Sequence, residues 1–64
     1  MQPYQARVVE EKAELDEKLA KLQAFLSTPI YQALDSEERI RLQRQSSIMQ
    51  EYSDILAERI AAFK

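Results

Sequence analysis

LSTPIYQALDSEE, residues 26–38, separates two segments that favour helix and contains the clearest stop and start signals of the chain. The residue before Pro29 is pushed out of the helical region, which ends the first segment. Ser27 or Thr28 can cap a new turn in which Pro29 takes the first position, where its missing N–H costs nothing. These residues predict a short helical turn over Ile30–Leu34.

A second long helix starts inside the same stretch. Asp35 can cap it, and Glu38 three residues later completes an arrangement like a capping box. The segment before the stretch begins with a Pro, which a first turn tolerates, and is rich in Ala, Glu, Lys, Gln and Leu. We therefore predict helices over about residues 3–26 and 36–62, joined by a connector over residues 27–35. With so short a connector, all 64 residues form a single all-α domain, an antiparallel helical hairpin.

Composition excludes many activities. The chain has no Cys and no His, so it has no disulfide, no zinc site and no His- or Cys-dependent catalysis. It also has no Gly, which excludes a Rossmann fingerprint, a P-loop and a nucleophile elbow. We expect no enzyme, no cofactor and no metal site. A chain of this length buries only about 60% of its unfolded surface, so we expect stability from helix packing, oligomerisation or both.

Net charge and hydropathy limit the kinds of partner that the chain can bind. Nine Lys plus Arg against eleven Asp plus Glu give a net charge of −2, which disfavours a nonspecific polyanion binder but allows a local basic pocket. Arg39, Arg41 and Arg44 form a modest basic cluster, but acidic residues frame it, so we expect no DNA binding. Residues 1–10 lack a basic leader, and no stretch approaches the ~20 apolar residues of a membrane span. We expect a cytoplasmic protein without membrane contact.

Both predicted helices carry a heptad stripe of apolar residues, which is typical of helices packed on a partner. In the first helix the stripe is Val8, Leu15 and Leu22, flanked by Leu19 and Leu26; in the second it is Leu42, Met49, Leu56 and Phe63. The acidic residues of the first helix, such as Asp16, occur among lysines such as Lys12 at spacings of three or four residues, which pair side chains on the surface of one helix. We interpret these charges as a solvated face.

A row of mainly polar residues runs beside each stripe: Tyr4, Glu11, Lys18 and Phe25 in the first helix, and Gln45, Tyr52 and Arg59 in the second. In a hairpin centred on the connector we expect Lys18 near the level of Gln45, Glu11 near Tyr52 and Tyr4 near Arg59. One interpretation is that the rows flank the core, with long cationic stems covering apolar surface. The other is a pocket between helices or protomers, where a Tyr stacks on a flat ring and Arg7, Lys18 or Arg59 meets a negative group.

The apolar face of the second helix is too broad for one partner, because Ile40, Ile48, Ile55 and Ile60 cannot all face the first helix. We therefore predict a homo-oligomeric helix bundle with Ile48, Ile55, Ile60 and Phe63 at the interface. The alternative is that Ile30, Tyr31 and Leu34 of the connector fold back over part of this face.

Beyond its periodicity, the chain resembles a known family. YQARVVEEKAELDEKL, residues 4–19, is followed by Lys21-Leu22, Phe25, Arg41-Leu42, Gln45, Met49, Tyr52, Leu56, Arg59-Ile60 and Phe63. These residues, above all the opening YQxRVxxE and the closing QxxxMxxYxxxLxxRI, resemble a widespread family of small proteins of tailed phages and prophages related to a crAss-like phage gene product. The likeness covers nearly the whole chain.

The resemblance implies a link to phage counter-defence sponges, small helical oligomers that sequester the cyclic di- or oligonucleotide signals of bacterial immunity such as CBASS. The residues that match the family motifs, and would contact the ligand, are Tyr4, Arg7, Gln45, Tyr52 and Arg59. We add Glu11 and Lys18 to these candidate ligand residues because they lie in the same row of the first helix as Tyr4. Tyr would stack on a base, Arg or Lys would pair with phosphate, and Gln45 or Glu11 would hydrogen-bond a base edge.

Two other functions stay open. The chain could be a helical interaction protein whose isoleucine face inhibits or assembles with a host or phage protein. A DNA-associated regulator ranks last. Unlike larger sponges, this chain has no flexible loop to close over a ligand, so a ligand would lie between adjacent protomers and its binding would be coupled to assembly.

Overall fold

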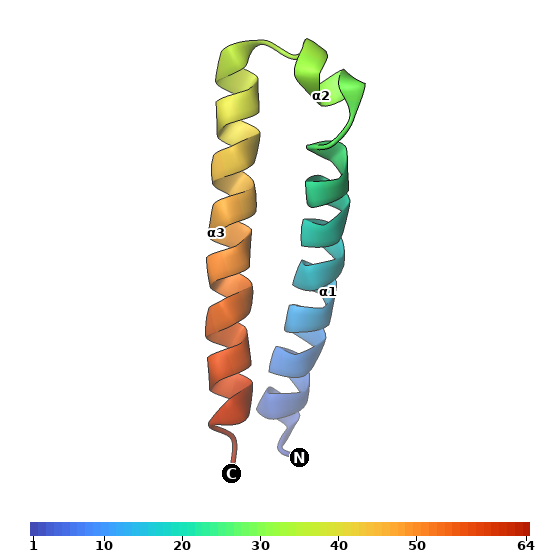
Figure 1. Ribbon diagram of the computed structural model, residues 1–64. Helices are drawn as coiled ribbons and strands as arrows, with labels where there is room; N and C mark the ends of the chain where they lie inside the picture. The colour runs from blue at the N-terminus through green and yellow to red at the C-terminus, as the bar shows by residue number, and fades with distance from the viewer.

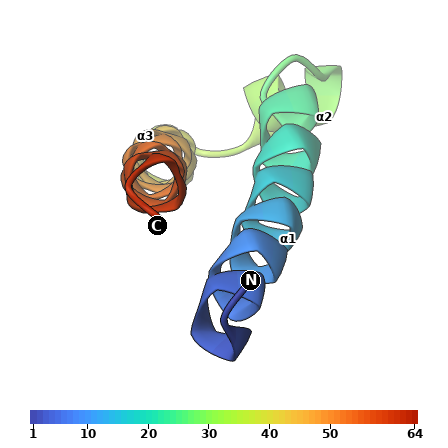
Figure 2. The same cartoon turned by 90° about the horizontal axis from the view of Figure 1, so that it is seen from below.

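The computed structural model describes all residues 1–64, and they form three helices: α1 (Pro3–Phe25), α2 (Pro29–Ala33) and α3 (Ser36–Ala61). Figure 1 shows α1 and α3 side by side and antiparallel, with α2 at one end and both termini at the other. Viewed nearly along α3, α1 is inclined to it (Figure 2). The predicted all-α hairpin with a connecting helical turn is confirmed, and it measures 47 × 14 × 13 Å. None of its helices combines the length and the apolar character needed to cross a bilayer.

The caps form where the connector sequence predicts them. Thr28 caps α2: its Oγ1 accepts a hydrogen bond of 3.2 Å from the Tyr31 amide and donates one of 2.7 Å to the Phe25 carbonyl. Asp35 caps α3, since its Oδ1 accepts a 2.7 Å hydrogen bond from the Glu38 amide. Each cap satisfies an amide that the helix itself leaves without a partner, so these residues fix where the two helices begin.

Tyr31 anchors the connector to the end of the helix pair. Its ring is buried and meets the Phe25 ring edge-on at a centroid distance of 6.2 Å. Its hydroxyl donates a 3.2 Å hydrogen bond to the carbonyl of Arg39. Leu34 is half-buried, while Ile30 points into solvent with 66% of its surface exposed. The connector therefore covers the end of the seam but leaves the isoleucines further along α3 uncovered.

The heptad stripes form the seam between α1 and α3, as predicted. Leu56 has no exposed surface, and Val8 and Leu19 are buried with it. The half-buried residues of the seam are Leu15, Leu22, Leu26, Leu42, Met49, Ile60 and Phe63. Two polar residues, Gln5 and Ser53, are also buried there. Such a narrow seam makes only a small core for a chain of this length.

A polar layer crosses the middle of the seam. Lys12 Nζ donates to Asp16 Oδ2 at 2.6 Å and to Ser53 Oγ at 3.1 Å, and the Ser53 hydroxyl donates to Asp16 Oδ1. Lys12 and Asp16 are half-buried, so they belong to the predicted solvated face only in part. Their spacing of four residues does give an ion pair, but the pair also reaches across to α3 because Ser53 stands where the stripe would otherwise have an apolar residue.

The register of the hairpin differs from the expected one by about one turn. The Tyr4 ring meets the Phe63 ring edge-on at 5.9 Å, so Tyr4 lies at the level of Phe63 and not of Arg59. The hydrogen bonds of Ser53 to residues 12 and 16 give the same shift. Glu11 then lies near the level of Leu56 and Lys18 near that of Met49. Apolar periodicity of seven could not distinguish these registers, because both keep the stripes in contact.

Candidate functional site

The predicted ligand residues lie along one side of the hairpin. On α1, a seam residue directly follows each of Tyr4, Glu11 and Lys18. On α3, a seam residue directly follows each of Gln45, Tyr52 and Arg59. In an antiparallel pair, rows with the same offset from the seam flank the same side of it. Arg7 is three residues after Tyr4 and four before Glu11, so it joins the row on α1. We call this set the polar side: Tyr4, Arg7, Glu11, Lys18, Gln45, Tyr52 and Arg59.

The aromatic rings of the polar side are open to solvent. Tyr4 is 53% exposed and Tyr52 42% exposed. The Tyr52 hydroxyl has no hydrogen bond within the chain, whereas the Tyr4 hydroxyl accepts a long one of 3.5 Å from Gln5 Nε2. Gln45 is exposed and donates to the sulfur of Met49 at 3.8 Å. Both tyrosines therefore offer a ring face or edge to a planar ligand.

The cations of the polar side have no carboxylate partner. The three ion pairs of the chain join Lys12 to Asp16, Lys21 to Glu17 and Arg41 to Glu38, as the side-chain distances show. Arg7, Lys18 and Arg59 are exposed and belong to none of them. Glu11 is half-buried and unpaired as well. The polar side therefore carries three unpaired positive charges, which can bind an anion, and one unpaired carboxylate, that of Glu11.

A single hairpin does not enclose the polar side. Of its seven residues only Gln45 lines a hollow, one of about 290 Å³ shared with Arg41, Arg44, Ile48 and Met49. In one chain the rows simply flank the core, which is the first of the two sequence interpretations. A pocket between protomers, the second interpretation, stays a prediction.

Comparison with known families identifies the group to which this chain belongs. The model of the Sequestin family matches residues 2–62. The chain is a member of the Sequestin family. Its name denotes sequestration, and all residues of the polar side fall within the matched range. No curated protein and no solved structure matches the chain.

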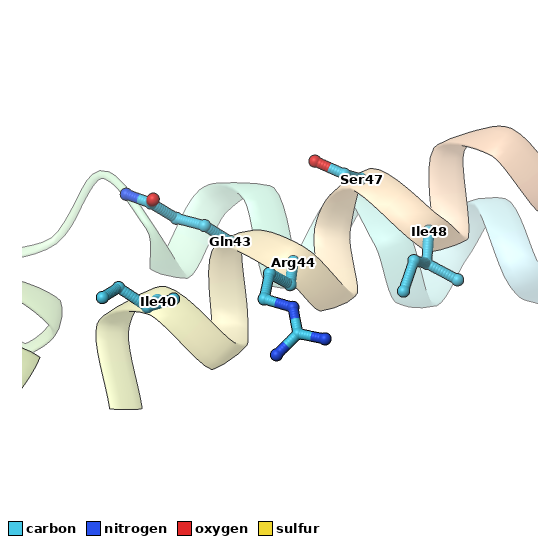
Figure 3. Close-up of a pocket in the computed structure, with 5 residues that line it drawn as sticks. All are labelled: Ile40, Gln43, Arg44, Ser47 and Ile48. Carbon is cyan, nitrogen blue, oxygen red and sulfur yellow. The ribbon is translucent and has the colours of Figure 1, made fainter. Parts of the chain in front are cut away.

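The outer face of α3 in this Sequestin chain has a hollow that includes Ile40 and Ile48, two residues of the predicted isoleucine face. Ile40, Gln43, Arg44, Ser47 and Ile48 line an open hollow of about 380 Å³ on α3 alone. Figure 3 shows the side chains of Arg44 and Ile48 extending below the helix in this view and those of Gln43 and Ser47 above it, so the two pairs border the hollow from its two edges. Arg44 was predicted only as part of a basic cluster framed by acidic residues, and Gln43 and Ser47 belong to no predicted site.

The predicted oligomer residues fall into two groups in the Sequestin hairpin. Ile48 is 60% exposed and Ile55 54% exposed, so both are available to a partner. Ile60 and Phe63 are half-buried within the chain, and Phe63 already contacts Tyr4. The first two residues therefore offer far more apolar surface to a second chain than the last two do.

One titratable group of this Sequestin chain has a clearly shifted pKa, and this group lies outside the polar side. The pKa of Asp16 is lowered, mainly by the hydrogen bond from Lys12 and then by the one from Ser53. No three acidic side chains of the chain gather closely enough to hold a metal ion. The unpaired cations and tyrosines thus make the polar side the strongest candidate for ligand contact.

Proposed function

We propose that this Sequestin-family chain is a phage- or prophage-encoded counter-defence protein, related to the crAss-like phage product. It binds and sequesters a cyclic di- or oligonucleotide immune signal in the host cytoplasm, without catalysis and as a homo-oligomer. The carrying observation is that Arg7, Lys18 and Arg59 are exposed without a carboxylate partner on the same side as two exposed tyrosines. The family match supports the sequestering part of the proposal.

The chemistry of the polar side fits the parts of a cyclic nucleotide. Its phosphates are permanent anions, which Arg7, Lys18 and Arg59 would bind through charge-assisted hydrogen bonds. Its bases are flat, and stacking on a Tyr ring is worth about 1–3 kcal/mol per base. Gln45 and Glu11 offer an amide and a carboxylate for a base edge. Sequestration needs tight binding only, so no nucleophile, metal or general base is required.

Assembly is part of the proposal. The polar side is an open surface in one hairpin, and a drug-sized ligand usually has most of its surface buried when it binds tightly. A second protomer would supply the missing wall. Ligand binding would then stabilise the oligomer as well as the fold, since a ligand stabilises every state that binds it.

A thermal-shift screen against cyclic dinucleotides and trinucleotides, with linear dinucleotides as ligand controls, tests the proposal. A ligand at 100 times its Kd adds roughly 2.7 kcal/mol of stability, which raises the Tm of a small domain by many degrees. Arg59→Ala should abolish this rise. Lys21→Ala removes the same charge from a residue outside the polar side, where Glu17 pairs with it, and should retain the rise.

Two results would contradict the proposal: no rise with any cyclic nucleotide, or equal losses in Arg59→Ala and Lys21→Ala. The first result would favour the helical interaction protein, because the exposed Ile48 and Ile55 are suited to a protein partner. In that case Ile48→Asp, and not Arg59→Ala, would remove function from the chain. Comparing the two variants in an infection assay separates these functions.

A further inference from the structure

Arg39 carries a positive charge at the end of the seam between the two long helices. It lies three residues before Leu42, so it continues the spacing of the seam on α3. Its side chain is half-buried, and its Nε atom is buried without a hydrogen-bond partner. Arg39 belongs to none of the three ion pairs of the chain. Buried donors without an acceptor are rare in proteins, so this guanidinium needs an explanation.

The two terminal nitrogens of the Arg39 guanidinium are available to a ligand. The hydrogen bond that involves Arg39 uses its carbonyl, and of its side-chain nitrogens only Nε is buried without a partner. Both Nη atoms are therefore accessible and unpaired. A guanidinium whose stem and Nε are packed against the protein is less hydrated than one in open water, and its attraction to an anion is correspondingly stronger.

Arg39 lines a hollow of about 360 Å³ between α2 and the beginning of α3. The Tyr31 hydroxyl, on the α2 side of the hollow, donates a 3.2 Å hydrogen bond to the Arg39 carbonyl and so holds α2 against this part of α3. Three exposed side chains of the hollow have amide or hydroxyl groups that can donate hydrogen bonds. They are Gln32 of α2 and Ser36 and Gln43 of α3. The hollow therefore combines one cation with three neutral donors.

The carboxylates at the beginning of α3, those of Asp35, Glu37 and Glu38, do not line this hollow. Asp35 accepts the capping hydrogen bond of 2.7 Å, and Glu38 pairs with Arg41 at 2.8 Å, so two of the three are already engaged. Arg44 borders the adjoining hollow of Figure 3 and belongs to no ion pair either. This part of α3 therefore has two unpaired cations and one unpaired carboxylate, which favours an anion in the hollow of Arg39.

We propose that this hollow is a binding site for a phosphate group, which the Nη atoms of Arg39 hold while Gln32, Ser36 and Gln43 donate to its other oxygens. A phosphate group fits these donors better than a carboxylate does, because it presents three strong acceptor oxygens in a tetrahedral arrangement. Since Gln32 lies on α2 and the other donors lie on α3, the bound phosphate joins the connector to the second long helix.

The phosphate site is separate from the polar side and does not rest on the proposed function. Ile40 and Gln43 directly follow seam residues of α3, whereas the polar side consists of residues on the opposite flank of the seam. Free inorganic phosphate and a phosphate monoester share the required chemistry. The volume of about 360 Å³ lies within the range of sites for small organic ligands, roughly 300–1,000 Å³, and Ile40 offers an apolar wall to an esterified group.

NMR titration of the ¹⁵N-labelled chain tests the site, with inorganic phosphate in one series, adenosine monophosphate in a second and sodium chloride of equal ionic strength as the control. We expect saturable shifts of the Arg39 Nε–H and Gln43 side-chain amide signals, with a Kd of about 1 mM or tighter. Arg39→Gln should weaken binding about tenfold or more, because it removes charge-assisted hydrogen bonds. Gln43→Ala, outside the seam, should weaken binding by a smaller factor. Arg41→Gln removes the same charge from a residue that Glu38 pairs with, and should leave binding unchanged.

Saturation with inorganic phosphate supports the site with the free ion as its source, and saturation with adenosine monophosphate alone supports it with a monoester. Shifts that match those in sodium chloride would refute the site. So would an Arg39→Gln variant that is helical by circular dichroism and binds as tightly as the wild type, or shifts confined to the polar side. The cyclic-nucleotide screen depends on Arg59, so Arg39→Gln should retain any rise in Tm that Arg59→Ala abolishes. The two proposals therefore fail by different measurements.

Discussion

Lys12 of α1 and Ser53 of α3 are 41 positions apart in the chain, and a hydrogen bond of 3.1 Å joins their side chains across the helix pair. Asp16 completes the group by accepting from both of them. A polar layer within a mainly apolar seam favours one register, because sliding α3 along α1 would leave the ammonium and carboxylate of the layer without Ser53. The layer therefore specifies how the two helices align.

Ser53→Ala tests the energetic weight of this layer. The substitution keeps the helix but removes a hydroxyl that both accepts from Lys12 and donates to Asp16. We expect the free energy of unfolding to fall by about 1–2 kcal/mol in urea titrations. Ser47→Ala is the matched control on the same helix: Ser47 is exposed and should change stability by less than about 0.5 kcal/mol. Equal effects at both positions would contradict the role of the layer.

Asp16 makes the stability of the hairpin pH-dependent. The hydrogen bonds from Lys12 and Ser53 hold the pKa of Asp16 below its ordinary value, so the folded chain binds fewer protons than the unfolded chain at acidic pH. The contribution is fully present above about pH 4 and is lost as the pH falls through the lowered pKa of the folded state. Thermal melts from pH 7 to pH 2 should show a smaller loss of Tm for Asp16→Asn than for the wild type. Glu10→Gln, at an exposed position outside the layer, should follow the wild-type curve.

Tyr31 connects the short helix to the start of α3. Tyr31→Phe keeps the ring contact with Phe25 and loses only the hydrogen bond to the carbonyl of Arg39, so we expect a loss of about 1 kcal/mol. Tyr31→Ala removes the ring as well and should cost about 3–5 kcal/mol. Denaturant titration of both variants measures the two contributions separately. Similar losses in both variants would show that ring packing matters little here.

Much of the fold could be predicted from the sequence because its signals are local. Pro29, Thr28 and Asp35 act on backbone groups within a few residues of themselves, so the helix ends follow from them. Lys12 and Asp16 show the limit of such reasoning. Their spacing is the same for a solvated ion pair and for one that also bonds across a seam, and only the position of Ser53 separates the two cases.

The sequence pattern singles out the residues of the polar side but not their geometry. Tyr4 and Arg59 stood out because polar residues replaced apolar ones beside the stripe, and both are exposed on the polar side. Their levels along the hairpin depend on the register, which a repeat of seven leaves undetermined by about one turn. Whether the polar side closes into a pocket depends on a second chain, about which a single sequence contains only the indirect signal of the exposed isoleucines.

Leu56 and Ile55 are neighbours in sequence, but Leu56 is buried and Ile55 is exposed. Substitutions at the two positions can therefore distinguish the stability of the single chain from that of the oligomer. Leu56 has no exposed surface, so Leu56→Ala should cost about 2–5 kcal/mol at any protein concentration. Ile55 is 54% exposed in one hairpin, and its apolar surface would be covered only in the homo-oligomer of the proposed function. Ile55→Ala should therefore lower the Tm at high protein concentration, where the oligomer is populated, and lose this effect on dilution. Melting curves over a hundredfold range of concentration measure both variants. An Ile55→Ala effect that persists unchanged on dilution would place Ile55 in the fold of the single chain and contradict its role in the oligomer.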